Sequence, residues 1–139
     1  MGARKRLAAE ARKESNRTKC VARLVDNNAS PRKTRLMADL VRGKNVDYAL
    51  NVLKYSKKES AEKIRKLLLS AVANWQAKNE NARVEDSNLY VKEIFVDGGT
   101  MLKRLRVAPQ GRGYRIRKRS NHITVVLDSR VENVNQTEE

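Results

Sequence analysis

The stretch VAPQGRGYRIRKRS, residues 107–120, carries a dense run of positive charge between two strand-like segments of this 139-residue chain. It lies in an acid-free interval, because Asp97 is the last acidic residue before it and Asp128 is the next. Eight lysines and arginines fall in that interval with no carboxylate to pair with them. A folded core does not accept unpaired charges. The stretch is therefore either a solvated loop or an arm that lies against a polyanion.

The composition of the whole chain favours the polyanion. Thirty-one Lys and Arg against sixteen Asp and Glu give a formal net charge of +15, which opposes compaction unless an anionic partner offsets it. Nucleic acid is the first candidate. A membrane surface is the second, but no run approaches the roughly 18 apolar residues of a transmembrane helix, and the basic N-terminus lacks the apolar segment of a signal peptide. The single cysteine, Cys20, excludes an intrachain disulfide and suits a reducing compartment.

The charge is unevenly distributed along the chain, with positive blocks over residues 1–23, 30–79 and 98–127. Residues 1–19 form a basic N-terminal extension, whose alanines and alternating charges predict a nascent helix that orders on RNA. Residues 131–139 form an acidic tail with no core pattern, which we expect to be disordered. The intervening residues 20–130 are predicted to form a single domain.

Two amphipathic helices are predicted in the first half of this domain. The first runs from the N-cap Ser30, followed by Pro31, to Gly43. Its expected apolar stripe consists of Leu36, Met37, Leu40 and Val41. The second covers residues 46–55, with an apolar face of Val46, Ala49, Leu50 and Leu53.

A third and longest helix is expected to form the spine of the core. It is predicted to start at Ser56, with Glu59 at capping-box spacing, and to end at the cluster 79–81. Its apolar residues recur at offsets of 3, 4 and 7 and include Ala61, Ile64, Leu67, Leu68, Ala71, Val72 and Trp75.

Period-2 patterns predict three strands, at residues 20–25, 89–96 and 122–127. Antiparallel pairing of the last two leaves about residues 98–121 as a long hairpin. Its turn is supplied by Pro109, Gly111 and Gly113. The predicted class is α+β, with three helices packed on a small antiparallel sheet and a long basic β-hairpin protruding from it.

The residues do not predict a catalytic, metal or cofactor site. His122 is the single histidine, and before an apolar strand it is more often hydrogen-bonded or phosphate-facing than a metal ligand. Residues 111–113 follow no strand-to-helix turn of a dinucleotide-binding unit. The carboxylates are scattered, and none pairs with His122 in the sequence, so we predict neither an enzyme nor a bound cofactor.

Several separated motifs stand in a fixed order along the chain. They are SPRKTRLMADLVRGK (30–44), ALNVLKYSKK (49–58), KLLLSAVANWQ (66–76), LYVKEIFVDGG (89–99) and HITVVL (122–127), with Lys103–Arg104 and Gly111–Arg112 between the last two. This order resembles the bacterial-type large-subunit ribosomal protein L22 family over about residues 18–130. The chain departs from the family pattern at the hairpin tip, where residues 107–110 replace Pro-Arg-Ala.

The resemblance implies a cytoplasmic structural constituent of the large ribosomal subunit, without enzymatic activity or cofactor. Family members bind 23S rRNA with the globular face and the extended hairpin, support subunit assembly and line the polypeptide exit tunnel with the hairpin tip. The implied partners are 23S rRNA, neighbouring large-subunit proteins such as ribosomal protein L4, and the nascent polypeptide, but no membrane. The corresponding tip residues are Val107, Ala108, Pro109, Gln110, Gly111, Arg112, Gly113 and Tyr114.

RNA gives the cations of this chain a physical role, since Lys and Arg neutralise phosphates and release counterions. Arg32, Lys33 and Arg35 stand in a first helical turn, where cations oppose the helix dipole unless a phosphate is present. Tyr114 is the aromatic residue best placed to stack on a base. The residues predicted to contact rRNA are Arg4, Lys5, Arg6, Arg17, Lys19, Arg32, Lys33, Arg35, Lys103, Arg104, Arg106, Arg112, Arg115, Arg117, Lys118, Arg119 and His122.

A DNA-bending architectural protein is the alternative interpretation. Such proteins insert an apolar residue from a basic β-arm into the minor groove, and Pro109 is the candidate wedge. That function needs a dimer to present two arms, and no predicted helix keeps a long apolar face after core packing. A nucleic-acid enzyme is a third class, but catalytic residues are lacking.

Overall fold

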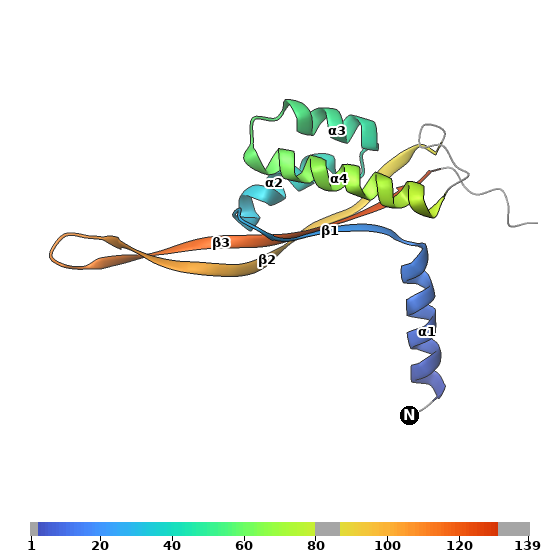
Figure 1. Cartoon of the computed structure of the whole chain (residues 1–139), viewed down its shortest axis with the longest axis horizontal. Helices are drawn as coiled ribbons and strands as arrows, with labels where there is room; N and C mark the ends of the chain where they lie inside the picture. Colours follow the sequence, from blue (N-terminus) through green and yellow to red (C-terminus); the bar gives the residue numbers. More distant parts are fainter. Residues whose placement is uncertain (1–2, 80–86, 131–139) are drawn as a thin grey trace, which may run out of the picture.

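The computed structural model describes residues 3–79 and 87–130. Three helices lie on one face of a three-stranded sheet, a fourth helix stands apart, and two strands extend beyond the sheet as a ribbon (Figure 1). In chain order the elements are α1 (Ala3–Thr18), β1 (Cys20–Asn27), α2 (Pro31–Val41), α3 (Val46–Tyr55), α4 (Glu59–Lys78), β2 (Leu89–Val107) and β3 (Gly113–Ser129). The predicted α+β class is confirmed, while the expectation for the tail 131–139 lies outside the described residues.

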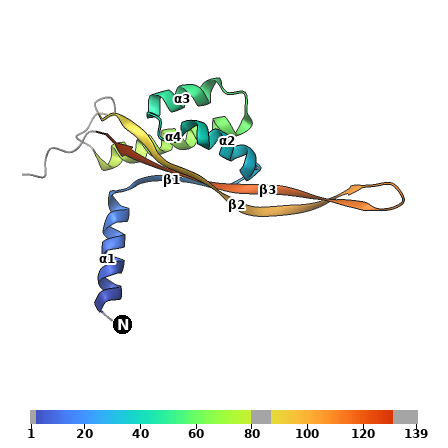
Figure 2. The same ribbon diagram turned by 180° about the vertical axis from the view of Figure 1, so that it is seen from behind.

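The sheet is antiparallel, and its strand order β1-β3-β2 makes β3 the central strand. Pairing of β2 with β3 begins at Leu89↔Ser129 in the body and continues to Val107↔Gly113 at the far end. We call residues 98–121 the arm, which leaves the body as a twisted ribbon (Figure 2). Both strands are longer than the predicted apolar segments, because backbone pairing continues where the side chains change from apolar to basic.

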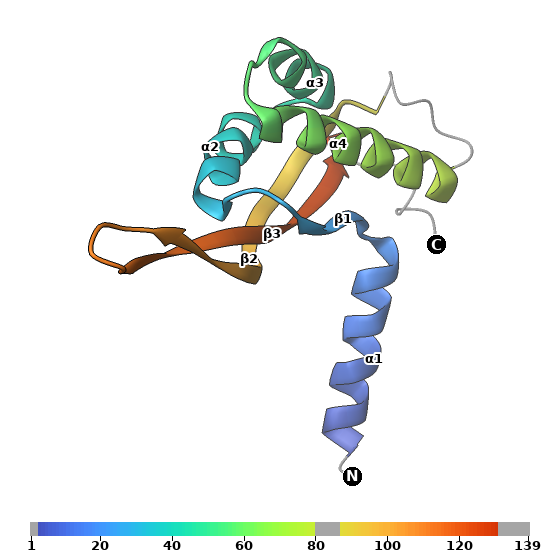
Figure 3. The same ribbon diagram turned by 60° about the vertical axis from the view of Figure 1, so that its left-hand side comes forward.

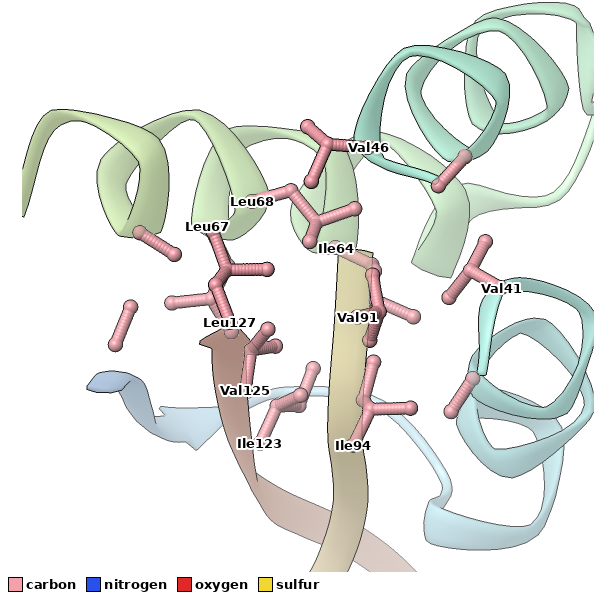
Figure 4. Packing of buried hydrophobic residues seen from close by; sticks show 14 of the residues in the cluster. Val41, Val46, Ile64, Leu67, Leu68, Val91, Ile94, Ile123, Val125 and Leu127 are labelled. Carbon is pink, nitrogen blue, oxygen red and sulfur yellow. The ribbon is translucent and has the colours of Figure 1, made fainter. Parts of the chain in front are cut away.

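The core lies between the helices and one face of the sheet. Figure 4 shows side chains of α4, among them Leu68, lying over Val91 and Val125 of the sheet. α2 contributes Met37 and Val41, both buried. Trp75 and the predicted apolar face of α4 are largely buried as expected, so α4 is the element around which the core is built.

The predicted stripe of α2 is half wrong. Met37 and Val41 are buried as expected, but Leu36 and Leu40 are 54% and 53% exposed. The buried face instead includes Thr34 and Ala38. Helical geometry still explains this, since the buried set 34, 37, 38 and 41 has the 3.6-residue period. Hydrophobicity alone predicted the wrong buried residues on α2. A small alanine and a hydrogen-bonded threonine fill the buried face in place of the two leucines.

The predicted start of the third helix at Ser56 is also wrong. α4 begins at Glu59, with Lys58 as its N-cap and no capping hydrogen bond from a side chain. Ser56 instead closes α3 as its C-cap, and its hydroxyl contacts the Met37 sulfur at 3.7 Å. The capping-box spacing is present in the sequence, but Ser56 is the C-cap of α3 and therefore cannot be the N-cap of α4.

A buried polar network holds the root of the arm. The Asn121 side-chain amide donates to the Ala29 carbonyl at 2.8 Å and to the Thr34 hydroxyl at 3.1 Å, and it accepts from the Asn27 amide at 3.0 Å. The Thr34 hydroxyl also lies 3.2 Å from the hydroxyl of Ser60. The network therefore joins β1, β3 and the starts of α2 and α4 at the point where the arm leaves the body.

The Leu68→Ala variant tests whether α4 is the spine of the core. Leu68 is fully buried, so the change is expected to lower the free energy of unfolding by about 2–5 kcal/mol. Leu69→Ala is the matched control, because Leu69 is the next residue and is 46% exposed; its effect should stay within about 0.5 kcal/mol. Denaturant unfolding measures both values, and equal effects would contradict the packing.

The two glycines at the arm root make a second matched pair. A Cβ added at Gly99 would lie 2.6 Å from the Ser120 hydroxyl oxygen and 3.2 Å from the Ser120 carbonyl carbon, whereas one at Gly98 would meet nothing within 4 Å. Gly99→Ala is expected to lower the free energy of unfolding by about 1–3 kcal/mol. Gly98→Ala should change it by less than about 0.5 kcal/mol in the same measurement. A tolerated Gly99→Ala would mean that this close approach does not constrain the root.

Candidate nucleic-acid interface

The arm presents cations on both of its faces. Directly opposed residues of an antiparallel pair lie on the same face, and successive pairs alternate between faces. One face therefore carries the pairs Leu102↔Lys118, Arg104↔Ile116 and Arg106↔Tyr114. The other carries Met101↔Arg119, Lys103↔Arg117 and Leu105↔Arg115. A ribbon that is basic on both sides is suited to being surrounded by a polyanion rather than lying on its surface.

Nothing within the arm neutralises these charges. The acid-free interval covers all of it, and among the described residues no ion pair involves an arm cation. Lys103 and Arg117 stand opposite each other, and like charges in that position destabilise a strand pair. A two-stranded ribbon is at best marginally stable in water. In the part of the chain that the structure describes, no carboxylate offsets these charges, so an external anion would stabilise the arm.

The tip is a tight turn with small residues. The Ala108 N–H donates to the Arg112 carbonyl at 2.8 Å, and the Arg112 N–H reaches the Pro109 carbonyl at 3.4 Å. Gln110 and Gly111 both have positive φ, +60° and +67°, as the central residues of a type I′ turn do. Ala108 is buried within the turn, whereas the other predicted tip residues are exposed and Val107 is 91% exposed.

Four of the predicted RNA-contact residues have side-chain partners within the protein. Arg6 forms an ion pair with Glu10 at 3.7 Å, and Arg104 donates to the Lys103 carbonyl at 2.9 Å. Arg35 donates from Nε and Nη2 to the Val96 carbonyl, at 3.1 and 2.9 Å. The Nδ1 atom of His122 accepts a hydrogen bond from the backbone N–H of Asp26 at 3.0 Å. Of the two roles predicted for His122, hydrogen bonding within the protein is therefore the one that the structure shows. The remaining predicted cations are exposed: those of α1 and Lys19, those at the start of α2, and those of the arm.

The position of Arg35 also has a structural explanation. β2 is an edge strand, and its outward carbonyls have no partner in the sheet. Arg42, two turns later on α2, donates from Nη2 to the Ile94 carbonyl at 2.9 Å. The backbone of Gly43 and Lys44 pairs with Val91 at 2.9 Å in both directions. These contacts from α2 and the residues after it therefore cover the edge of β2, which would otherwise be open to pairing with another chain.

Sequence reasoning missed the residues that hold the arm and α1 in place. Asn121 was not singled out, although an amide beside an apolar strand segment is a signal for a buried polar contact. Lys78 was not singled out at all. Its Nζ donates to the carbonyls of Arg17 and Lys19, at 2.8 and 2.6 Å, and so ties the end of α1 to the end of α4.

The described residues show little that points to other chemistry. They contain no cluster of three His, Cys, Asp or Glu side chains that could hold a metal ion. Burial raises the pKa of the Cys20 thiol, although nearby Lys78 acts in the opposite direction, so Cys20 favours its protonated, unreactive form. No described helix has both the length and the apolar content needed to span a membrane.

Comparison with known proteins gives consistent matches over most of the chain. Residues 22–128 match the family described as ribosomal protein L22p/L17e. The large ribosomal subunit protein uL22 of Flavobacterium psychrophilum is 60% identical over 129 residues, 93% of this chain and 94% of its own length. That of Christiangramia forsetii is 62% identical over 127 residues, 91% and 94% of the two chains.

The protein of the same name from Bacteroides fragilis is 57% identical over 136 residues, 98% of this chain and 99% of its own. The arm, the three helices on the sheet and all three strands lie almost entirely within the matched residues 22–128. The chain belongs to the ribosomal protein L22p/L17e family.

Proposed function

We propose that this protein is a structural component of the large ribosomal subunit that binds 23S rRNA through the arm and the basic surface of the body. The main support for this proposal is the arm, because it is a basic ribbon without a carboxylate along its whole length. The names of the relatives, large ribosomal subunit proteins, support the same assignment.

The geometry of the arm favours folded RNA over an open duplex surface. The nine or ten strand residues of each leg extend the ribbon by about 30 Å, at roughly 3.3 Å per residue. Cations on both faces can meet phosphates on both sides only if RNA encloses the ribbon. Recognition of this kind depends on RNA shape and backbone rather than on sequence. Exposed Tyr114, beside the tip, can add one stacking contact with a base.

On the body, exposed Arg32 and Lys33 at the start of α2 are proposed to contact rRNA phosphates. No acidic residue stands in that first turn, where acids would normally be favourable. Two nitrogens of Arg35, Nε and Nη2, donate hydrogen bonds to the Val96 carbonyl, so any rRNA contact that Arg35 makes uses Nη1. The α1 cations and Lys19 complete the proposed rRNA-binding set.

The tip, residues 107–114, is proposed to form part of the wall of the polypeptide exit tunnel, next to a protein such as ribosomal protein L4. The tip is the part of the arm farthest from the body (Figure 1). Its Ala, Pro and Gly residues make a narrow turn, which leaves room for a passing chain. The flanking cations would hold both legs on rRNA, with the nascent polypeptide meeting only the turn.

The rRNA contacts of the arm predict a change in salt dependence. Arg115, Arg117 and Arg119 lie on one face of the ribbon, and their joint replacement by Ala should reduce the slope of log affinity against log salt by about 2–3, at 0.7–0.9 per lost phosphate contact. Lys54, Lys57 and Lys58, at the end of α3 and just before α4, lose the same charge when replaced by Ala but lie outside the arm. That control triple should leave the slope nearly unchanged, and equal slopes for both triples would refute arm-specific binding.

Photo-crosslinking tests the tunnel position of the tip. A photoreactive amino acid at exposed Gln110 is expected to crosslink to a stalled nascent chain in assembled ribosomes, whereas one at exposed Met101 near the root should not. Deletion of residues 102–104 shortens one leg only and should move the tip, so the Gln110 crosslink should be lost or shifted without loss of the protein from the subunit. Equal crosslinking from both positions, or none from Gln110 at full occupancy, would contradict the proposed position.

A further inference from the structure

α1 is not explained by the family fold. The family match begins at residue 22, after α1 has ended, although the alignment with the Bacteroides fragilis relative covers 98% of this chain and so extends into it. Apart from a contact of Lys78 with its last turn, α1 packs against none of the helices and strands that the structure describes. All of its side chains whose exposure is described are exposed. Figure 3 shows α1 leaving the start of β1, away from the helices and in a different direction from the arm.

An isolated helix of this length is marginal in water, so α1 needs a partner. At 100° per residue, five of its six cations fall in a sector of about 140°, with Ala9 and Asn16 between them. These five are Lys5, Arg6, Arg12, Lys13 and Arg17. Arg4 lies outside the sector, and Glu14 lies on the opposite side. α1 therefore presents one strongly basic face about 18 Å long, from residue 5 to residue 17.

The other side of α1 argues against a membrane or a hydrophobic protein groove. It carries one large apolar residue, Leu7, among alanines and two glutamates. One of these, Glu10, borders the basic face and pairs with Arg6 at 3.7 Å. Binding of an amphipathic helix to a membrane surface depends on a much larger apolar face. A basic face flanked by small residues instead matches the phosphate backbone of RNA, along which Lys and Arg side chains can reach without steric obstruction.

Lys78 gives the direction of α1 a physical cause. Its Nζ donates to the Arg17 carbonyl at 2.8 Å, within the last turn of α1, and to the Lys19 carbonyl at 2.6 Å. A cation at this end is favoured by the helix dipole and satisfies carbonyls that have no helical partner. Because Lys78 belongs to the end of α4, this contact connects α1 to the rigid body.

We infer that α1 is a second RNA-binding element, whose basic face lies along rRNA phosphates at a place separate from the RNA around the arm, with Lys78 as its positioning residue. This inference rests on the proposed function, since it takes rRNA as the partner. It adds a site outside the matched family residues and a residue, Lys78, that contacts no RNA itself but sets where the site points.

Directed cleavage of rRNA can locate this site. An iron chelate attached to Ala9→Cys, at the centre of the basic face, should cleave rRNA in assembled subunits at positions different from those cut by the chelate on Gln110→Cys at the tip. The unaltered protein is the background control, because its one cysteine, Cys20, is buried.

The outcomes separate the two proposals. Cleavage from position 110 without cleavage from position 9 would overturn the inference and leave the proposed function standing. Cleavage at the same nucleotides from both positions would overturn the claim of a separate site. No cleavage from either position would overturn both.

Two charge insertions test the orientation of the basic face. Ala9→Glu places a carboxylate at the centre of the sector and should lower the salt slope of binding to 23S rRNA by about 0.7–0.9. Ala11→Glu places the same charge on the opposite side of the same exposed helix, so the slope should not change. Equal effects would mean that α1 acts as an unoriented polycation, which contradicts the inference.

Lys78 is tested through the position of the cuts rather than through stability. Lys78→Met removes the contact with the Arg17 and Lys19 carbonyls and should scatter or weaken the cuts made from Ala9→Cys, while those from Gln110→Cys stay in place. Lys78→Arg keeps the positive charge and the donors, so it should restore the cuts. Unchanged cuts from Ala9→Cys in Lys78→Met would show that Lys78 does not position α1.

Discussion

The uncompensated positive charge of the arm is the constraint on which the rest of the structure depends. Cations on both faces repel one another, and Lys103 stands directly opposite Arg117. The chain nevertheless has to hold this ribbon in one direction before the anionic partner arrives. It does so by making the arm a continuation of β2 and β3, so that the strand at the centre of the sheet also forms one leg of the ribbon.

β3 consequently has two chemically different halves. Ile123, Val125 and Leu127 are buried under the helices, whereas residues 115–119 are basic and exposed except for half-buried Ile116. The transition falls at Asn121, which is fully buried and hydrogen-bonded to Ala29, Thr34 and Asn27. Apolar burial thus stabilises the body independently of the arm. The polar network around Asn121 fixes the root of the arm to this stable body at the point where apolar packing ends.

Much of this fold could be predicted from sequence because its signals are local. The α3 and α4 periods, the three strand segments and the acid-free hairpin all follow from residue spacing. The failures occur where a residue has a partner far along the chain. Ser56 closes α3 instead of opening α4, and Leu36 gives way to Ala38 because the space under α2 is set by other elements. Likewise Arg35 has its partner 61 residues away, at the Val96 carbonyl of an edge strand.

The contact between Arg35 and the Val96 carbonyl explains why a cation stands at the start of a helix. It also shows that the cations of this chain have two different roles. Basic residues in the first turn of α2 oppose the helix dipole, so an intrinsic preference does not explain them. Arg35 gains two hydrogen bonds from a carbonyl that would otherwise be unpaired, which accounts for one of the three. Lys78 is used similarly, on carbonyls at the end of α1. Cations that complete backbone hydrogen bonding therefore hold the frame, and the exposed ones without such a partner, above all on the arm, remain available for an external anion.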